Sequence, residues 1–108
     1  MKIAFRGGAE QDIAAIAEFY AAAGPGLGAQ FFEELDKSLS LLRRQRYAGA
    51  TVPGQTGFRQ LLLNRFPYRL IYRVTSEAII VIAVCHQRQH PRLWWNRVQE
   101  QAPIYMAA

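Results

Sequence analysis

The stretch FPYRLIYRV, residues 66–74, decides the fold of this chain of 108 residues. Because successive side chains of a strand point to opposite faces, Arg69, Ile71 and Arg73 share one face. The other face carries tyrosine, leucine and valine, which suit burial against a core. An ordinary half-buried strand has at most one arginine on its wet face. We therefore expect a central strand whose arginine face is partly uncovered.

The flanking sequence supplies neighbours for this strand. Residues 58–64 (FRQLLLN) and 78–86 (AIIVIAVCH) are strand-like and are joined to it by the short breaks NRFP and TSE. Such short connections join antiparallel neighbours in hairpins. The last run is apolar on both faces, which is typical of the most buried strand. Residues 2–6 alternate polar and apolar before two glycines and predict a further strand.

Two helices are predicted between the first strand and the hairpins. In residues 9–24 the apolar side chains from Ile13 to Tyr20 recur at i, i+3, i+4 and i+7, with acidic residues in the first turn, where the helix dipole favours them. A second helix is expected over about residues 28–46. Its inner face is formed by Phe31 or Phe32, Leu35, Leu39 and Leu42. The Gly-Pro-Gly connection is short, so the two helices should form an antiparallel hairpin.

These elements predict an α+β fold in the order β-α-α-β-β-β. A small twisted antiparallel sheet would pack on the helical hairpin, with residues 47–57 as a loop. A short carboxyl-terminal helix is expected to begin at Pro91. We expect one domain over residues 1–98 and a flexible tail over 99–108.

Several classes of protein are disfavoured by composition. The single Cys85 lies in an apolar run and is expected to be a small buried hydrophobe, as in proteins of a reducing cytosol. No window approaches the run of about 18 apolar residues that a membrane span needs. The amino terminus does not match a signal peptide. We expect a soluble, cytoplasmic protein without a cofactor.

The positive charge lies in the second part of the chain. Residues 1–40 hold three basic and six acidic residues, whereas residues 41–108 hold ten arginines against Glu77 and Glu100. Arginine suits bidentate contacts with phosphate or carboxylate. The expected partner is therefore nucleic acid or an acidic protein surface. A basic face that only keeps the domain soluble is the alternative.

Few residues offer recognisable chemistry. His86 and His90 have no Cys, Asp or Glu at ligand spacing, so no metal site is predicted. The GPGLG segment lacks the lysine and hydroxyl residue of a phosphate-binding loop. His86 could act as a general base with Tyr68 or Tyr72, or it could cap the end of its strand. Pairing across the hairpins could bring it to the arginine face beside Arg59.

Two longer strings carry a family resemblance. GFRQLLLNRFPYRLIYRV (57–74) and IAVCHQRQHPRLWWNR (82–97) resemble the RelE/ParE superfamily of toxins from type II toxin–antitoxin systems. The matching residues outside the central strand are Gly57, Arg59, Val84, His86, Arg88, Pro91 and Trp94. The helix pattern AxxDIxxIxxFY fits as well. The resemblance covers about residues 3–98.

The resemblance implies a toxin that an acidic antitoxin neutralises, but it leaves two branches. RelE-like toxins cleave messenger RNA on the ribosome, whereas ParE-like toxins inhibit DNA gyrase. RelE-like enzymes use lysines on the second strand, an arginine on the third, and an arginine and a tyrosine near the carboxyl end. Here Arg69 matches, Gln60 and Leu62 stand at the lysine positions, and a leucine–tryptophan pair replaces the tyrosine, with Arg88 as the second arginine. Most of an acid–base set is missing.

We therefore predict a ParE-like gyrase inhibitor that forms a hetero-oligomer with a ParD-like antitoxin. A metal-independent mRNA endoribonuclease is the alternative, and a non-toxic basic nucleic-acid-binding domain is the second alternative. The predicted target-binding residues are Arg59, Arg69, Arg73, His86, Arg88, Arg92 and Trp94. A ribonuclease would use Arg69, His86 and Arg88. The predicted antitoxin contacts are Ile13, Ile16, Tyr20, Phe31 and Leu35.

Overall fold

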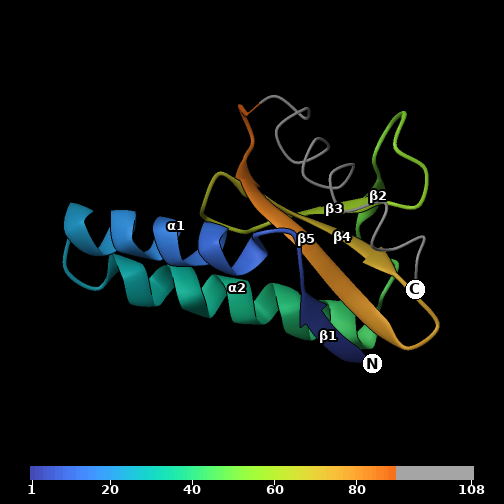
Figure 1. Cartoon of the computed structure of the whole chain (residues 1–108). Helices are drawn as coiled ribbons and strands as arrows, with labels where there is room; N and C mark the ends of the chain where they lie inside the picture. The colour runs from blue at the N-terminus through green and yellow to red at the C-terminus, as the bar shows by residue number, and fades with distance from the viewer. Residues whose placement is uncertain (90–108) are drawn as a thin grey trace.

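The computed structural model describes residues 1–89 and confirms the predicted α+β class (Figure 1). Its elements are β1 (Lys2–Phe5), α1 (Ala9–Ala23), α2 (Leu27–Arg44), β2 (Ala50–Thr51), β3 (Arg59–Leu62), β4 (Tyr68–Val74) and β5 (Ala78–His86). None of the helices in this range is long and apolar enough to cross a membrane. The predicted helix from Pro91 and the predicted domain boundary at residue 98 lie outside the described residues.

The five strands form one sheet in the order β1-β5-β4-β3-β2. The pairs from β5 to β2 are antiparallel, as the short connections predict. The wholly antiparallel prediction is wrong at the edge, because β1 pairs with β5 in parallel. A parallel pair needs a long crossover, and the helical hairpin that follows β1 begins one. The short strand β2 also forms inside the predicted loop.

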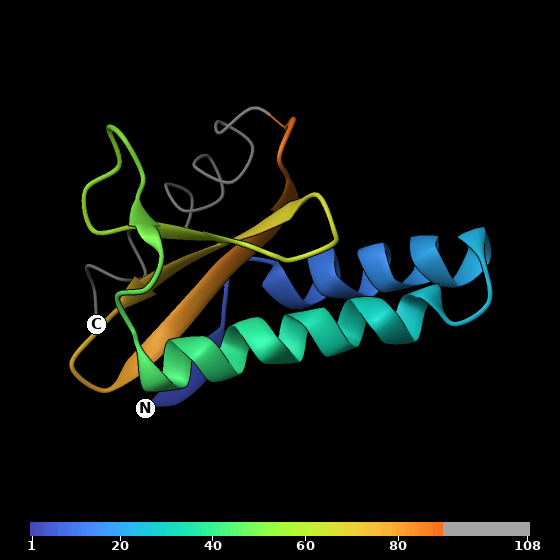
Figure 2. The same cartoon turned by 180° about the vertical axis from the view of Figure 1, so that it is seen from behind.

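Both helices lie on the same side of the sheet (Figures 1 and 2). The inner face of α2 packs against the tyrosine face of β4, where Leu70 and Tyr72 are fully buried. The buried residues of this core include Ile16, Phe31, Leu35, Leu39, Leu42, Leu70, Tyr72, Ile79, Val81 and Val84. The predicted burial of the tyrosine face is confirmed.

A β-bulge in β5 determines which side chains of this strand face the helices. Ile71 pairs with Ala83 and Tyr72 pairs with Val81, so Ile82 is an extra residue with no partner on β4. With this extra residue, Val81 and Val84 both face the helices although they are three positions apart. Strict alternation would have turned one of them to the opposite face.

The face opposite the helices carries a second apolar cluster. Its buried residues are Phe58, Ile71, Ile82, Ala83 and Cys85, none more than 8% exposed. Cys85 is thus a buried hydrophobe, as predicted. The expectation of an uncovered arginine face is wrong at the centre of this face. The apolar side chains that alternate with the arginines are numerous enough to form a cluster of their own.

The segment between α2 and β2 is fixed to the sheet by Tyr72. The Tyr72 hydroxyl accepts a hydrogen bond from the Gly49 amide (2.9 Å) and donates one to the Arg46 carbonyl (3.0 Å). Burial raises the pKa of Tyr72, against smaller opposing effects of the Gly49 hydrogen bond and the Arg59 charge. The hydroxyl therefore keeps its proton and remains able to donate at neutral pH.

Candidate functional site

Arg69 is held in a fixed position on the face opposite the helices. It stands on β4 between its cross-strand partners Leu62 and Cys85. One terminal nitrogen donates to the Gln60 side-chain oxygen (2.8 Å) and the other to the Gln87 carbonyl (2.6 Å). Its Nε atom is buried and has no hydrogen-bond partner in the part of the chain that the structure describes. These contacts fix the guanidinium and leave one desolvated donor unused.

A cavity of about 390 Å³ lies beside this guanidinium. We call it the Arg69 pocket; it is lined by Ala50, Gln60, Leu62, Arg69 and Gln87. Arg69 is the one ionisable group among these five residues. The amide of Gln60 and the side chain of Leu62, which occupy the predicted lysine positions, cannot transfer a proton at neutral pH. The pocket can bind an anionic group, but these residues supply no acid or base.

The predicted grouping of arginines holds for two members and fails for the third. Arg73 pairs with Ile80 and lies on the same face as Arg69, so this part is confirmed. Arg59 pairs with Tyr72, whose side chain faces the helices. Paired residues of neighbouring strands share a face, so Arg59 lies on the opposite side from Arg69. The register, which the sequence does not reveal, places it there.

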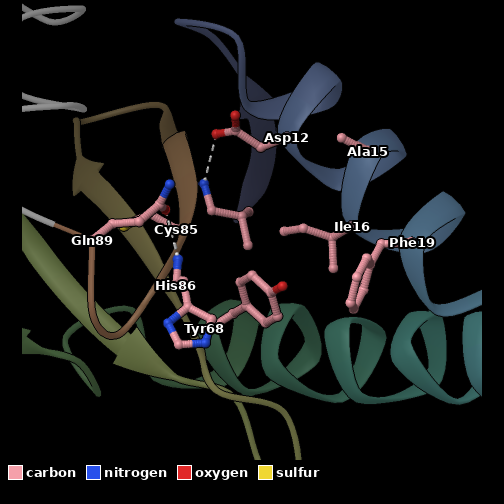
Figure 3. Close-up of a pocket in the computed structure, with 9 residues that line it drawn as sticks. Asp12, Ala15, Ile16, Phe19, Tyr68, Cys85, His86 and Gln89 are labelled. Atoms are coloured by element: carbon pink, nitrogen blue, oxygen red, sulfur yellow. Dashed lines mark hydrogen bonds between the residues drawn. The ribbon is translucent and has the colours of Figure 1, made fainter. Parts of the chain in front are cut away.

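His86 also lies on the helix side, so its predicted place beside Arg69 is wrong. It pairs with Tyr68, and the two rings meet edge to face with centroids 5.3 Å apart. The two residues border a cavity of about 360 Å³. Figure 3 draws the side chains that line this cavity. Its lining residues are Asp12, Ala15, Ile16, Phe19, Tyr68, Val84, Cys85, His86 and Gln89.

The hydrogen bonds of His86 close the end of β5. Its Nδ1 accepts from the Arg88 amide (3.0 Å), and its own amide donates to the Gln89 side chain (2.8 Å). With Nδ1 as an acceptor, the proton of a neutral ring is on Nε2, and no nitrogen lone pair is left for a base. Burial, with a smaller effect of nearby Tyr20, raises the pKa of Tyr68. The strand-capping interpretation of His86 therefore fits this geometry better than the general base.

The remaining predicted target residues are less well defined by position. Arg88 lies exposed in the turn after β5 and uses its backbone amide rather than its guanidinium in the contact with His86. Arg92 and Trp94 lie outside the described residues. Within residues 1–89, no group of three or more His, Cys, Asp and Glu side chains is placed to hold a metal ion.

Asp12 has a role that its sequence position does not reveal. Its carboxylate accepts a hydrogen bond from the Val84 amide (3.0 Å), drawn in Figure 3, and so ties α1 to β5 across the upper cavity wall. In the sequence it is only an acidic residue in the first turn of a helix. No local signal links it to a strand 72 positions away.

The predicted antitoxin contacts are largely core residues. Ile16, Phe31 and Leu35 are at most 8% exposed, and Ile13 and Tyr20 pack against the same core. The three buried side chains cannot present a surface in this conformation, so this part of the prediction is wrong. The apolar stripe of an amphipathic helix marks the side that faces its own core. The large apolar residues exposed on these helices are Phe19 (63%) and Phe32 (46%).

Comparison with known proteins places this fold in a family. The model of the ParE toxin of type II toxin-antitoxin system, parDE, matches residues 3–91. The chromosomal ParDE system of P. aeruginosa contains a chain that is 24% identical, with a TM-score of 0.68 over 80% of this chain and 95% of that one. The isolated RelE toxin of E. coli is 19% identical, with a TM-score of 0.49 over 92% and 96%. No curated protein matches. The chain belongs to the ParE family of toxins of type II toxin–antitoxin systems.

Proposed function

We propose that this toxin arrests growth in the cytoplasm by binding DNA gyrase through the Arg69 pocket, without cutting RNA. The observation that carries the proposal is the composition of that pocket. It presents a fixed guanidinium, and none of its lining residues within 1–89 can give or take a proton at neutral pH.

A cation alone is not sufficient for metal-free cleavage of RNA. A base must activate the 2′-hydroxyl, an acid must protonate the leaving oxygen, and cations must stabilise the charge on phosphorus. Arg69 can serve the last of these requirements. His86, which the sequence offers as a possible general base, lies on the opposite face of the sheet from Arg69. Its Nδ1 accepts a hydrogen bond at the end of β5. This arrangement supports a toxin that acts by occupying a site on its target.

Arg69 is well suited to anchor such a complex. Its side chain is already ordered by Gln60 and the Gln87 carbonyl, so little conformational entropy is lost when a partner binds. The positive charge of its guanidinium beside the cavity can be paired by an incoming carboxylate. Arginines in desolvated pockets are frequent hot spots of interfaces. A carboxylate of the target is the group expected to enter the pocket.

The test is a DNA supercoiling assay with purified gyrase and toxin freed from its antitoxin. We expect supercoiling to stop as toxin approaches stoichiometry with gyrase, and induced cells to form DNA-damage filaments. Full supercoiling at a large excess of folded toxin would reject gyrase as the target.

The ParD-like antitoxin is proposed to cover the outer side of the helices. A cavity of about 420 Å³ lies there, lined by Phe5, Glu10, Ile13, Ala14 and Phe32. Phe32 is 46% exposed, which leaves a large apolar surface for a partner. An antitoxin segment that folds on binding can bury this surface with its own apolar side chains.

Replacing Phe32 with glutamate is expected to weaken antitoxin binding by about 2 kcal/mol or more, because a charge replaces an apolar anchor of the interface. Toxicity without antitoxin should stay unchanged, since Phe32 lies on the helix side of the sheet. Titration of toxin with antitoxin by calorimetry measures the loss. The control is Ala29→Glu, which adds the same charge at an exposed position of α2. Equal affinities for Phe32→Glu and the unmodified toxin would place the antitoxin elsewhere.

A further inference from the structure

Two arginines meet at one exposed tyrosine beyond the end of α2. We name this surface the arginine–tyrosine patch; it consists of Arg46, Tyr47 and Arg59, and Arg43 and Arg44 precede it in the last turn of α2. The guanidinium carbon of Arg46 lies 5.1 Å from the centre of the Tyr47 ring, and that of Arg59 lies 4.9 Å from it. One ring thus positions two cations contributed by different parts of the chain.

The patch is built on a rigid support. Arg59 donates to the Gly49 carbonyl (2.8 Å) and to the Tyr47 carbonyl (3.4 Å) through the same terminal nitrogen. Tyr72 holds the backbone at Gly49 and Arg46 from below. The two cations are therefore placed before any partner arrives, which lowers the entropy that binding costs.

The positive charge of the patch is not neutralised by nearby acidic residues. Eight basic residues and no acidic ones occur between Asp36 and Glu77. The salt bridges found within residues 1–89 join Lys37 and Arg65 to Glu34, and none involves a patch arginine. The patch is thus a concentrated cationic surface.

The helix dipole explains only part of this charge. Arg43 and Arg44 lie in the last turn of α2, where a cation stabilises the helix end. Arg46 and Arg59 lie beyond that turn, on the connecting segment and on β3. Their joint placement on Tyr47 needs another explanation, and a bound anion provides one.

We propose that the arginine–tyrosine patch binds the phosphate backbone of duplex DNA. Paired guanidinium groups suit a ligand with closely spaced negative charges, and phosphate contacts supply most of the affinity in such complexes. The arginine and tyrosine anchors of protein interfaces lie in desolvated pockets, whereas Arg46 and Tyr47 are exposed. The exposed Phe19 and Phe32 lie near the end of α1 and near the start of α2, whereas the patch follows the end of α2. Figure 1 shows that the α1–α2 connection is at the opposite end of the helical hairpin from the end of α2.

This inference goes beyond the proposed function, because its ligand is DNA and not gyrase. A toxin that contacts DNA would bind gyrase more tightly when gyrase holds its DNA substrate. The contact is tested without gyrase, so its failure would leave the supercoiling result unaffected.

The experiment measures binding of the toxin to a fluorescent duplex of random sequence by anisotropy over a series of salt concentrations. The logarithm of the affinity should fall linearly with the logarithm of salt concentration. Arg46→Gln should reduce the slope by about 0.9, the value for one lost phosphate contact. Arg46 is chosen for substitution because its guanidinium lies against the Tyr47 ring, whereas the guanidinium of Arg59 also holds the Gly49 carbonyl.

Arg6→Gln is the matched control, because it also removes one exposed positive charge. Arg6 follows β1, and the strands β5 and β4 lie between β1 and β3, which carries Arg59. An unchanged slope for Arg6→Gln supports a localised patch. Equal losses for Arg6→Gln and Arg46→Gln would overturn the proposal, because binding would then follow net charge. Competition by an acidic glutamate-rich peptide at lower concentrations than DNA would also overturn it and would assign the patch to a protein partner.

Discussion

Arg69→Gln is expected to abolish toxicity in cells while leaving the toxin folded. The substitution removes the guanidinium from the Arg69 pocket, so gyrase affinity should fall by about 2 kcal/mol or more, roughly 30-fold. The free energy of unfolding should change by less than about 1 kcal/mol, because the lost hydrogen bonds are offset by removal of a buried, unsatisfied Nε. Growth after induction and urea denaturation of the purified variant measure the two effects.

The control for this prediction is again Arg6→Gln, which removes the same charge from a different surface and should remain fully toxic. Arg73, on the same face as Arg69, is expected to add to the effect in a double variant. If Arg69→Gln lost stability in proportion to toxicity, Arg69 would be a structural residue. The pocket would then not be the target-binding site.

Gly49→Ala is expected to destabilise the fold by about 1–3 kcal/mol, the usual cost of overpacking. A Cβ atom at this position would lie 2.6 Å from the Gln60 carbonyl oxygen and 2.8 Å from the Tyr72 ring and hydroxyl. The Gln60 carbonyl belongs to β3 and cannot move without disturbing its pairing. Relief of the overlap would separate Gly49 from Tyr72 and release the segment that connects α2 to β2. Urea denaturation followed by circular dichroism measures the loss.

Ala48→Ser is the matched control for Gly49→Ala, because Ala48 is the neighbouring residue and is exposed. It should leave the unfolding midpoint unchanged. An unfolding midpoint for Gly49→Ala equal to that of the unmodified protein would show that the segment after α2 is not held by Tyr72 as the structure indicates.

Local sequence signals predict the individual elements well. The predicted strands 68–74 and 78–86 agree with β4 and β5, and the helices end within two residues of the predicted positions. These elements depend on side-chain periodicity and on glycine and proline breaks, which are written in the chain itself.

Relations between elements were predicted less well, because they depend on register and pairing. The period of a strand fixes which residues share a face within that strand, but not which face its neighbour presents. For this reason the sequence alone suggests that Arg59 and His86 lie beside Arg69. In the structure their cross-strand partners, Tyr72 and Tyr68, face the helices. The parallel pairing of β1 and the bulge at Ile82 have no local signal either.

The candidate site was predictable where it depends on side chains alone. Arg69 and the missing lysines at Gln60 and Leu62 are visible in the sequence, and the structure brings these three residues to one pocket. The Gln87 carbonyl, which also holds Arg69, is a backbone group that any residue type provides. The sequence left open whether Phe31 or Phe32 is on the inner face of α2, and the structure buries Phe31 and exposes Phe32, the residue proposed for the antitoxin surface.

A ribosome cleavage assay tests most directly whether this toxin acts without catalysis. Purified toxin is added to ribosomes stalled with a messenger RNA codon in the A site, and the ends of the message are mapped. We expect an intact message at toxin concentrations that block gyrase. A message cut at the A site would contradict action without catalysis, since the chain would then perform proton transfers for which the described lining residues of the Arg69 pocket supply no group.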